Sequence, residues 1–103
     1  MIRQSFSIAG YWDVIVLYFI DMDEYDAGFT KTYFNERKSI IGISYPTSQE
    51  QLFNTLVHEA KHLQSHICRY YNVPEDGEQA AYLIGYIIQQ MHKAFRKFIS
   101  TRT

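Results

Sequence analysis

The hydrophobic period of this chain changes at Pro46 from two residues to about 3.6, and this change constrains the fold more than any other feature. Before Pro46, three runs rich in β-branched and aromatic residues predict strands, and after it two long apolar stripes predict helices. Because strands precede helices without βαβ alternation, we expect an α+β fold, with an N-terminal antiparallel sheet of about three strands followed by two long helices on one face.

The three strand candidates differ in character. YWDVIVLYFID (residues 11–21) is apolar on both alternating sets, which is typical of a strand covered on both faces, with a short buried helix as the alternative. DEYDAG, a group of turn formers, separates it from GFTKTYF (28–34). NERK then predicts the connection of a hairpin whose second strand is SIIGISY (39–45).

The first helix has a recognisable start. Thr47 or Ser48 can act as its N-cap, with Glu50 or Gln51 three residues on to complete a capping box. Its apolar face continues to about Tyr71, which makes this a helix of several turns.

A loop, NVPEDG (72–77), separates this helix from the last one. Asp76 is a candidate cap for the last helix, and Cys68 before the loop is expected to be a small core residue. The last helix has an apolar stripe of Ala80, Leu83, Ile84, Ile87, Ile88, Met91, Phe95 and Phe98.

Length and charge exclude several classes of protein. With 103 residues the chain forms one domain, 1–103, and its net charge of -1 offers no footprint for nucleic acid or an anionic membrane. The basic residues at the C-terminus indicate a solvated helix end. Without a signal-peptide pattern or an apolar run near 18 residues, we expect a soluble cytoplasmic protein.

The stretch LVHEAKHLQSH (56–66) carries the main functional signal. His58 and His62 are four residues apart, so on a helix their side chains leave the same face at roughly 6 Å along the axis and can converge on one zinc ion. His66 lies about 12 Å from His58 along the axis, too far to join them. Glu59 would lie beside the metal, where a general base belongs, and completes the pattern H-E-x-x-H. The alternative is a polar stripe on a helix surface.

A third ligand must come from elsewhere in the chain. Glu78, 16 residues beyond His62, is the first candidate, because small residues that allow close helix packing follow it. An antiparallel turn at 72–77 would, however, place Glu78 near the helix end rather than opposite His62. Glu75 and Asp76 compete with it, and capping a helix is the other role open to these acids.

NTLVHEAKHLQSHI followed by GEQAAYLIGYI resembles the gluzincin class of zinc metallopeptidases, and more closely a group of small uncharacterised peptidase-like proteins of bacterial and phage genomes. The resemblance covers about residues 26–91. It implies Zn2+ as cofactor, His58, His62 and Glu78 as ligands, and Glu59 as general base. It also implies an edge strand that can hold an extended peptide, for which residues 39–45 are the candidate by order. Tyr82 stands where larger gluzincins often have an acid. It is a candidate donor to a developing oxyanion, or a residue that fills the helix interface.

Three functions follow from these observations. The first is a zinc-dependent peptidase or other hydrolase, in which Glu59 takes a proton from water activated by the metal. The second is a catalytically silent protein that zinc stabilises. The third is an interaction module without metal, such as a homodimer formed through the aromatic C-terminal helix, where Tyr86, Phe95, Phe98 and Ile99 are the candidate residues.

Overall fold

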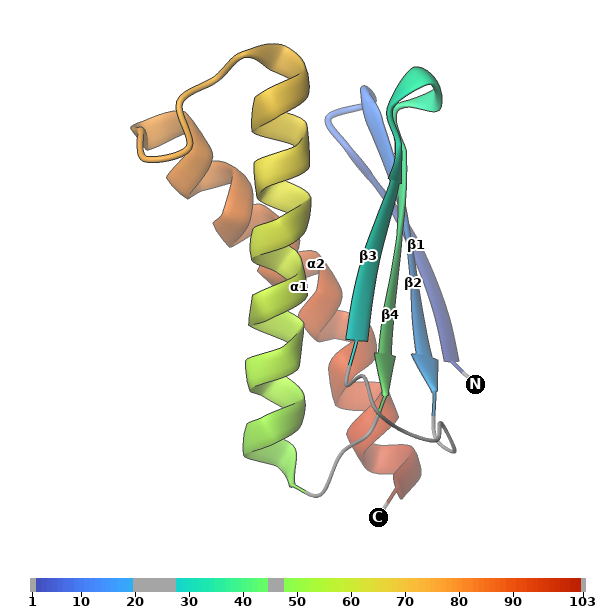
Figure 1. The fold of residues 1–103 in the computed structure, drawn as a ribbon. Helices are drawn as coiled ribbons and strands as arrows, with labels where there is room; N and C mark the ends of the chain where they lie inside the picture. The colour runs from blue at the N-terminus through green and yellow to red at the C-terminus, as the bar shows by residue number, and fades with distance from the viewer. Residues whose placement is uncertain (1, 20–27, 45–47, 103) are drawn as a thin grey trace.

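The computed structural model describes residues 2–19, 28–44 and 48–102, with side chains up to Lys97. Four strands come first: β1 (Ile2–Ile8), β2 (Trp12–Phe19), β3 (Gly28–Tyr33) and β4 (Lys38–Ser44). Two helices follow, α1 (Gln49–Tyr71) and α2 (Glu78–Arg102). Both helices lie on one face of the sheet (Figure 1). The predicted α+β order of strands and then helices is therefore confirmed.

The sheet differs from the prediction in strand number and in direction. Its order is β1-β2-β4-β3, and β2 pairs with β4 in parallel, whereas the other two pairs are antiparallel. The additional strand is β1, whose polar residues at alternate positions face away from the helices. It forms a hairpin with β2 through Ala9 and Gly10, which both have positive φ. A mixed four-stranded sheet thus replaces the predicted antiparallel one of about three strands.

The predicted β3–β4 hairpin is present, and a short 3-10 helix, η1 (Phe34–Glu36), connects its strands. β4 lies inside the sheet, so the expectation that residues 39–45 form the edge strand is wrong. β4 buries Ile41 and Ile43 toward the helices, which suits an interior position, while Lys31 lies exposed on the edge strand β3. Tyr45 and the predicted strand residues Ile20 and Asp21 lie outside the described residues.

The core lies between the sheet and the helices. One face of β2 supplies Trp12, Val14, Val16 and Tyr18, each at most 1% exposed. The opposite face of β2 is half-buried at Ile15 and Leu17. Helices cover only one face of this strand, so the expectation of cover on both faces is wrong. The helices contribute Leu52, Leu56, Ala60, Leu63, Ile67, Ala80, Ile87, Met91, Ala94 and Phe95.

The helix boundaries agree with the sequence pattern. Ser48 is the N-cap of α1, and its hydroxyl accepts a hydrogen bond from the Gln51 backbone N–H at 3.1 Å. The predicted end at Tyr71 is confirmed, and Asn72 follows in the left-handed region as C-cap. In α2 the first intrahelical bond, from Ala81 N to Gly77 O, puts Gly77 rather than Asp76 at the N-cap position.

The C-terminal helix packs against the rest of the protein with part of its aromatic stripe. Phe95 is buried and its ring meets that of Phe53 edge-on at 5.8 Å. Tyr86 is exposed, and the side chains of Phe98 and Ile99 lie outside the described set. Phe95 therefore belongs to the core rather than to an exposed patch.

Candidate metal centre

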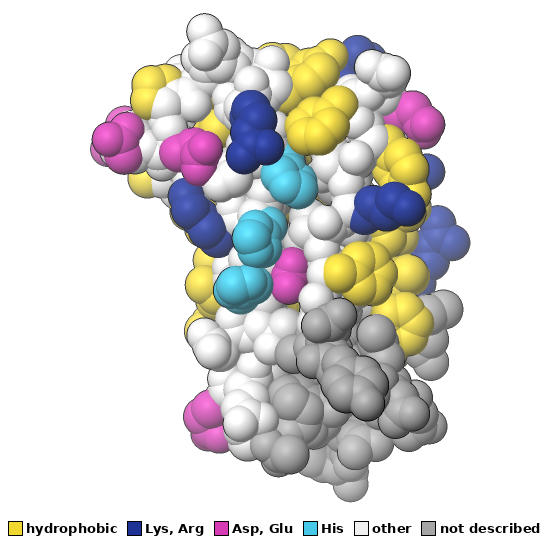
Figure 2. All heavy atoms as spheres, viewed as in Figure 1, with side chains coloured by type: hydrophobic (Ala, Val, Ile, Leu, Met, Phe, Trp, Pro, Cys, Tyr) yellow, Lys and Arg dark blue, Asp and Glu magenta, His cyan; other side chains and the backbone are white. Residues whose placement is uncertain are grey.

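Helix α1 presents two of its three histidines to solvent and its apolar stripe to the sheet. His58 and His62 are exposed, whereas the neighbouring Glu59 and Ala60 are buried. Figure 2 shows histidine side chains in a column over α1, with an acidic side chain beside them toward the sheet. The i, i+4 spacing thus produces the shared histidine face that the sequence predicts.

The two imidazole rings converge at their outer nitrogens. Nε2 of His58 and Nε2 of His62 lie 3.1 Å apart, and the ring centroids are 4.7 Å apart. Two nitrogens bound to one tetrahedral zinc ion at about 2.05 Å are roughly 3.3 Å apart, so the rings need only a small adjustment to hold a metal. The same distance is within the hydrogen-bonding range of the two ring nitrogens. The pair therefore fits zinc as two of its ligands.

Glu59 lies between α1 and the edge strand β3. Its side chain is 5% exposed, and its Oε1 accepts a hydrogen bond from Thr30 Oγ1 at 2.7 Å. The same hydroxyl oxygen lies 3.2 Å from the Glu59 backbone carbonyl, which ties β3 to this turn of α1. The bond to Thr30 thus fixes the carboxylate of the residue that follows His58 between α1 and β3.

Gly28 makes the close approach of β3 to Glu59 sterically acceptable. A Cβ on Gly28 would lie 2.8 Å from the Gly42 carbonyl oxygen, 3.0 Å from Thr55 Cγ2 and 3.2 Å from Glu59 Cγ. The carbonyl oxygen belongs to the paired strand β4 and cannot move freely. The start of β3 therefore needs a residue without a side chain.

Gly28→Ala is expected to lower the free energy of unfolding by about 1–3 kcal/mol, because the added methyl group overpacks this contact. Urea denaturation followed by circular dichroism measures the change. Gly85→Ala is the matched control, since a Cβ there meets nothing within 4 Å. A loss at Gly28 no larger than that at Gly85 would contradict the close packing of β3 on Glu59.

The three candidate acids for a third ligand occupy different positions. Glu78 is exposed in the first turn of α2, and Gln64 Nε2 donates to the Ala80 carbonyl at 3.1 Å in that same turn. Gln64 is two residues after His62, which is about 200° around the helix. The first turn of α2 thus packs on the side of α1 away from the histidines, and the structure does not bring Glu78 to them.

Glu75 is the acid that the structure ties to α1 near the histidine face. Its Oε1 accepts a hydrogen bond from Ser65 Oγ at 2.6 Å and lies 3.7 Å from Lys61 Nζ. Ser65 is three residues after His62, so the two side chains are neighbours on the helix surface. The hydrogen bond from Ser65, and secondarily the nearby cations, lower the pKa of Glu75 and keep it ionised. Asp76 lies exposed in the same loop.

The described residues do not contain a complete metal site. Within residues 2–19, 28–44 and 48–102, no three His, Cys, Asp or Glu side chains are placed to hold one metal ion together. The structure brings together His58 and His62, with Glu59 beside them in sequence. A third ligand from this part of the chain requires a side-chain or loop movement.

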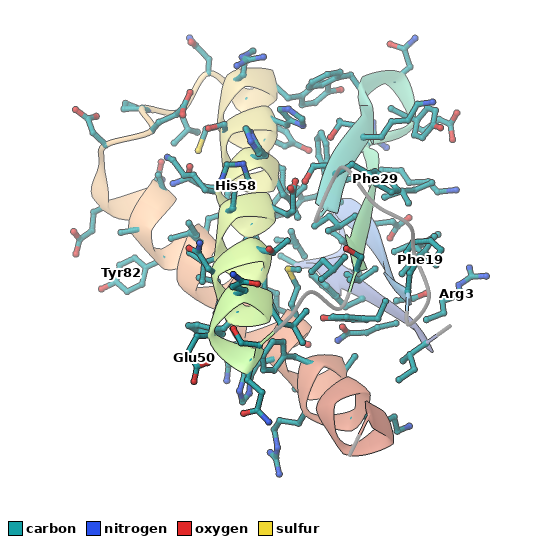
Figure 3. All side chains as sticks on the ribbon, turned by 60° about the horizontal axis from the view of Figure 1, so that its bottom comes forward. Arg3, Phe19, Phe29, Glu50, His58 and Tyr82 are labelled. Carbon is teal, nitrogen blue, oxygen red and sulfur yellow. The ribbon has the colours of Figure 1, made fainter. Side chains whose placement is uncertain are left out.

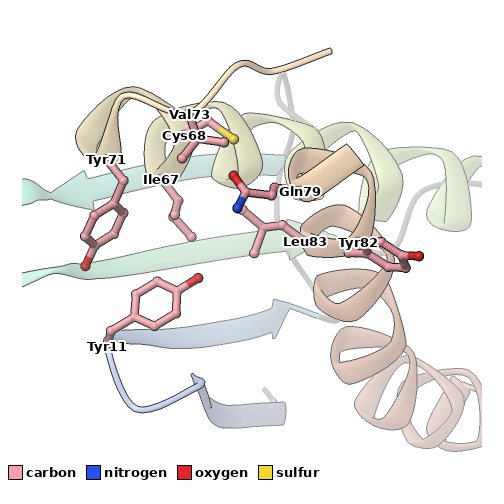
Figure 4. Close-up of a pocket in the computed structure, with 8 residues that line it drawn as sticks. All are labelled: Tyr11, Ile67, Cys68, Tyr71, Val73, Gln79, Tyr82 and Leu83. Carbon is pink, nitrogen blue, oxygen red and sulfur yellow. The ribbon is translucent and has the colours of Figure 1, made fainter. Parts of the chain in front are cut away.

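Tyr82 lies at a different part of the surface. It is 74% exposed and is directed away from α1, on which His58 lies (Figure 3). With Tyr11, Cys68 and Gln79 it lines an apolar cavity of about 470 Å³ between the α1–α2 corner and the β1–β2 turn (Figure 4). The structure therefore does not bring the predicted oxyanion donor to the histidine pair, nor does Tyr82 fill the helix interface.

Cys68 is buried, as expected, and burial raises the pKa of its thiol. A neutral thiol in an apolar wall is a packing group rather than a nucleophile. His92 is exposed on α2, and its ring stacks on Phe95 at 5.6 Å.

A chain of hydrogen bonds leads from the core to His66. Trp12 Nε1–H donates to Ser39 Oγ at 3.1 Å, Ser39 Oγ lies 2.7 Å from Thr32 Oγ1, and Thr32 Oγ1 lies 2.6 Å from His66 Nδ1. Burial lowers the pKa of His66. Arg69 and His62 make smaller contributions in the same direction, and Glu75 acts in the opposite direction. His66 is therefore neutral at neutral pH.

The direction of this chain follows from its first member. An indole N–H only donates, so Ser39 accepts from Trp12, and its own hydroxyl hydrogen has Thr32 Oγ1 as acceptor. His66 Nδ1 is then the described acceptor for the Thr32 hydroxyl hydrogen, and this arrangement, which satisfies every donor of the chain, leaves the imidazole proton on Nε2. In the opposite tautomer His66 also donates to Thr32, so either the Ser39 or the Thr32 hydroxyl hydrogen is left without an acceptor among the described residues, at a cost of about 1–3 kcal/mol for a buried hydroxyl.

Sequence reasoning missed Thr30, Thr32 and Ser39. The two threonines alternate along β3, so both face α1, and each contacts a different residue of the histidine helix. The alternation T-x-T in a strand candidate was the available signal, but it does not specify which helix residues lie opposite.

Comparison of the chain with protein-family models, with curated protein sequences and with solved structures finds no match. In the part of the chain that the structure describes, no helix is both long enough and apolar enough to cross a membrane.

Proposed function

We propose that this protein is a zinc-dependent hydrolase that cleaves peptide bonds, with His58 and His62 as metal ligands and Glu59 as general base. The 3.1 Å separation of the two histidine Nε2 atoms on an exposed helix face supports this proposal most strongly. The resemblance of residues 54–67 and 77–87 to gluzincins supports the choice of reaction.

Glu75 is our candidate for the third ligand, in place of Glu78. It is ionised, it belongs to a loop rather than to a helix, and its contacts with Ser65 and Lys61 hold it within about one turn of His62. Both contacts are made at the surface and are individually weak, so the carboxylate can leave them for a metal.

In this proposal Glu59 performs the proton transfer, and Thr30 holds its carboxylate in place. A zinc ion at the histidine pair would polarise a substrate carbonyl and lower the pKa of water. Glu59 accepts a proton from the attacking water and passes it to the leaving amine. Thr30 holds one carboxylate oxygen, so that the other is available for this exchange.

The edge strand β3 is the element on which an extended peptide would lie. Among the described strands, β3 pairs only with β4, which leaves its other backbone edge free next to α1. An extended peptide added along this edge would pass the histidine face. A peptide is therefore the substrate class that the sheet supports.

Cleavage of a mixture of synthetic peptides by zinc-loaded protein, read by mass spectrometry, tests the function. Cleavage should stop when 1,10-phenanthroline removes the metal and return when zinc is restored. Absence of cleavage, or cleavage that the chelator does not affect, would contradict the proposal.

Glu75→Ala is expected to weaken zinc binding by about tenfold or more, since it removes a ligand, whereas Glu78→Ala should leave the affinity unchanged. A zinc titration against a fluorescent chelator measures both variants. The reverse order of effects would assign the third ligand to Glu78, as the resemblance implies.

A catalytically silent zinc protein is the second candidate. The bond from Thr30 to Glu59 favours it, because this carboxylate already joins α1 to β3 and so has a structural role. Zinc bound at one per chain without any peptide cleavage would support this second function.

A further inference from the structure

We propose that His66 is a substrate-binding residue that donates a hydrogen bond from Nε2–H to a backbone carbonyl of the peptide, two residues from the bond to be cleaved. This inference rests on the proposed function, and it names a group that the metal site itself does not use. Its basis is the direction of the hydrogen-bond chain from Trp12 through Ser39 and Thr32.

The chain favours His66 as a donor at Nε2 and disfavours it as a metal ligand there. Nδ1 accepts from Thr32, so the proton of the neutral ring is on Nε2, where a metal would need a lone pair. The ring is held in place by Phe34, whose centroid is 5.8 Å away, and by the bond to Thr32. No further interaction of Nε2 is made by the described residues. Nε2–H is thus a fixed donor without a described acceptor.

The spacing on α1 matches the repeat of an extended peptide. His66 follows His62 by four residues, a rise of about 6 Å along the helix. In an extended chain the carbonyls of residues i and i+2 point the same way and are about 6.7 Å apart. A carbonyl held between His58 and His62 lies about 9 Å from His66 along the axis, so a second carbonyl about 6.7 Å further along the peptide comes within about 2–3 Å of the level of His66, which is a hydrogen-bond length.

The charges around His66 are consistent with a neutral carbonyl acceptor. Arg69 and Glu75 both act on His66 and oppose each other in their effect on its pKa, and His62 faces it from the preceding turn. A neutral acceptor needs no net charge from these groups. The edge strand contributes Thr32 on the other side, whose hydroxyl is already used.

The tautomer of His66 is measured first, in the full-length metal-free protein, by long-range ¹H–¹⁵N correlation at a pH well above the ordinary histidine pKa. His66→Phe assigns the signals. We expect the Nε2–H form to exceed the Nδ1–H form by about tenfold. Thr32→Val and Ser39→Ala should each reduce this ratio, while the His58 and His62 signals report that the variants are folded. A predominant Nδ1–H form, or a ratio unaffected by both substitutions, would overturn the inference.

Binding to the zinc-loaded protein is measured second, with a tripeptide hydroxamate and with acetohydroxamate as probes. His66→Phe should weaken the tripeptide hydroxamate by about tenfold and leave acetohydroxamate unchanged, because only the longer probe reaches His66. Equal effects on both probes, or no effect on either, would overturn the substrate-binding role. If neither probe binds the zinc-loaded wild type although the tautomer ratios are as expected, the proposed function is wrong, and the substrate-binding role, which rests on it, is overturned with it.

Discussion

Glu59→Gln is expected to bind zinc as the wild type does and to lose peptide cleavage by a factor of about 10² to 10⁴, which is the usual contribution of a general base. The amide cannot accept the proton of the attacking water at neutral pH. Its oxygen can still accept the hydrogen bond from Thr30, so the contact between α1 and β3 is retained. The substitution therefore separates the chemical role of Glu59 from its structural role.

Zinc content by mass spectrometry and the rate of cleavage of one peptide, measured on the same samples, check this expectation. Glu50→Gln is the matched control, because Glu50 lies exposed in the first turn of the same helix (Figure 3). Cleavage by Glu59→Gln at the wild-type rate would eliminate Glu59 as the base. Loss of zinc from this variant would indicate that Glu59 takes part in metal binding.

Trp12→Ala is expected to lower the free energy of unfolding by about 3–5 kcal/mol, a large part of the stability of a domain of this size. Trp12 is 1% exposed, and its ring contacts Phe34, Tyr70 and Tyr71 edge-on at 5.4 to 6.5 Å. The substitution leaves a cavity where β2 meets the end of α1, and it removes the donor to Ser39.

Urea denaturation followed by far-ultraviolet circular dichroism measures this loss, because the variant lacks the single tryptophan that fluorescence would need. Tyr82→Ala is the control and should change stability by at most about 0.5 kcal/mol, as expected for an exposed aromatic residue. A loss below about 1 kcal/mol for Trp12→Ala would contradict the central place of this ring in the core.

The helices and the order of elements could be predicted from the sequence because local signals determine them. Ser48 and Gln51 mark the start of α1, and the apolar stripe extends to its end at Tyr71. β1 was missed because its face toward the helices has Ile2, Gln4, Phe6 and Ile8, a pattern weaker than the runs that follow. The parallel pairing of β2 with β4 depends on where the β3–β4 hairpin joins the sheet, which local sequence does not encode.

Only part of the candidate site could be predicted from the sequence. The spacing of His58 and His62 determines their convergence on any regular helix, and the structure shows it. The third ligand is different, since the position of a loop acid depends on how α2 packs on α1. The contact of Gln64 with Ala80 decides this, and it turns the start of α2 away from the histidines. Glu75, rather than Glu78, consequently lies on the histidine side of α1.

Zinc content per chain, measured by mass spectrometry on untagged protein beside a His62→Ala variant, tests the central claim most directly. We expect about one zinc per wild-type chain and its loss in the variant, since His58 alone retains only one of the two converging nitrogens. No zinc in the wild type after the metal has been supplied, or equal zinc in both proteins, would contradict a metal site at this histidine pair.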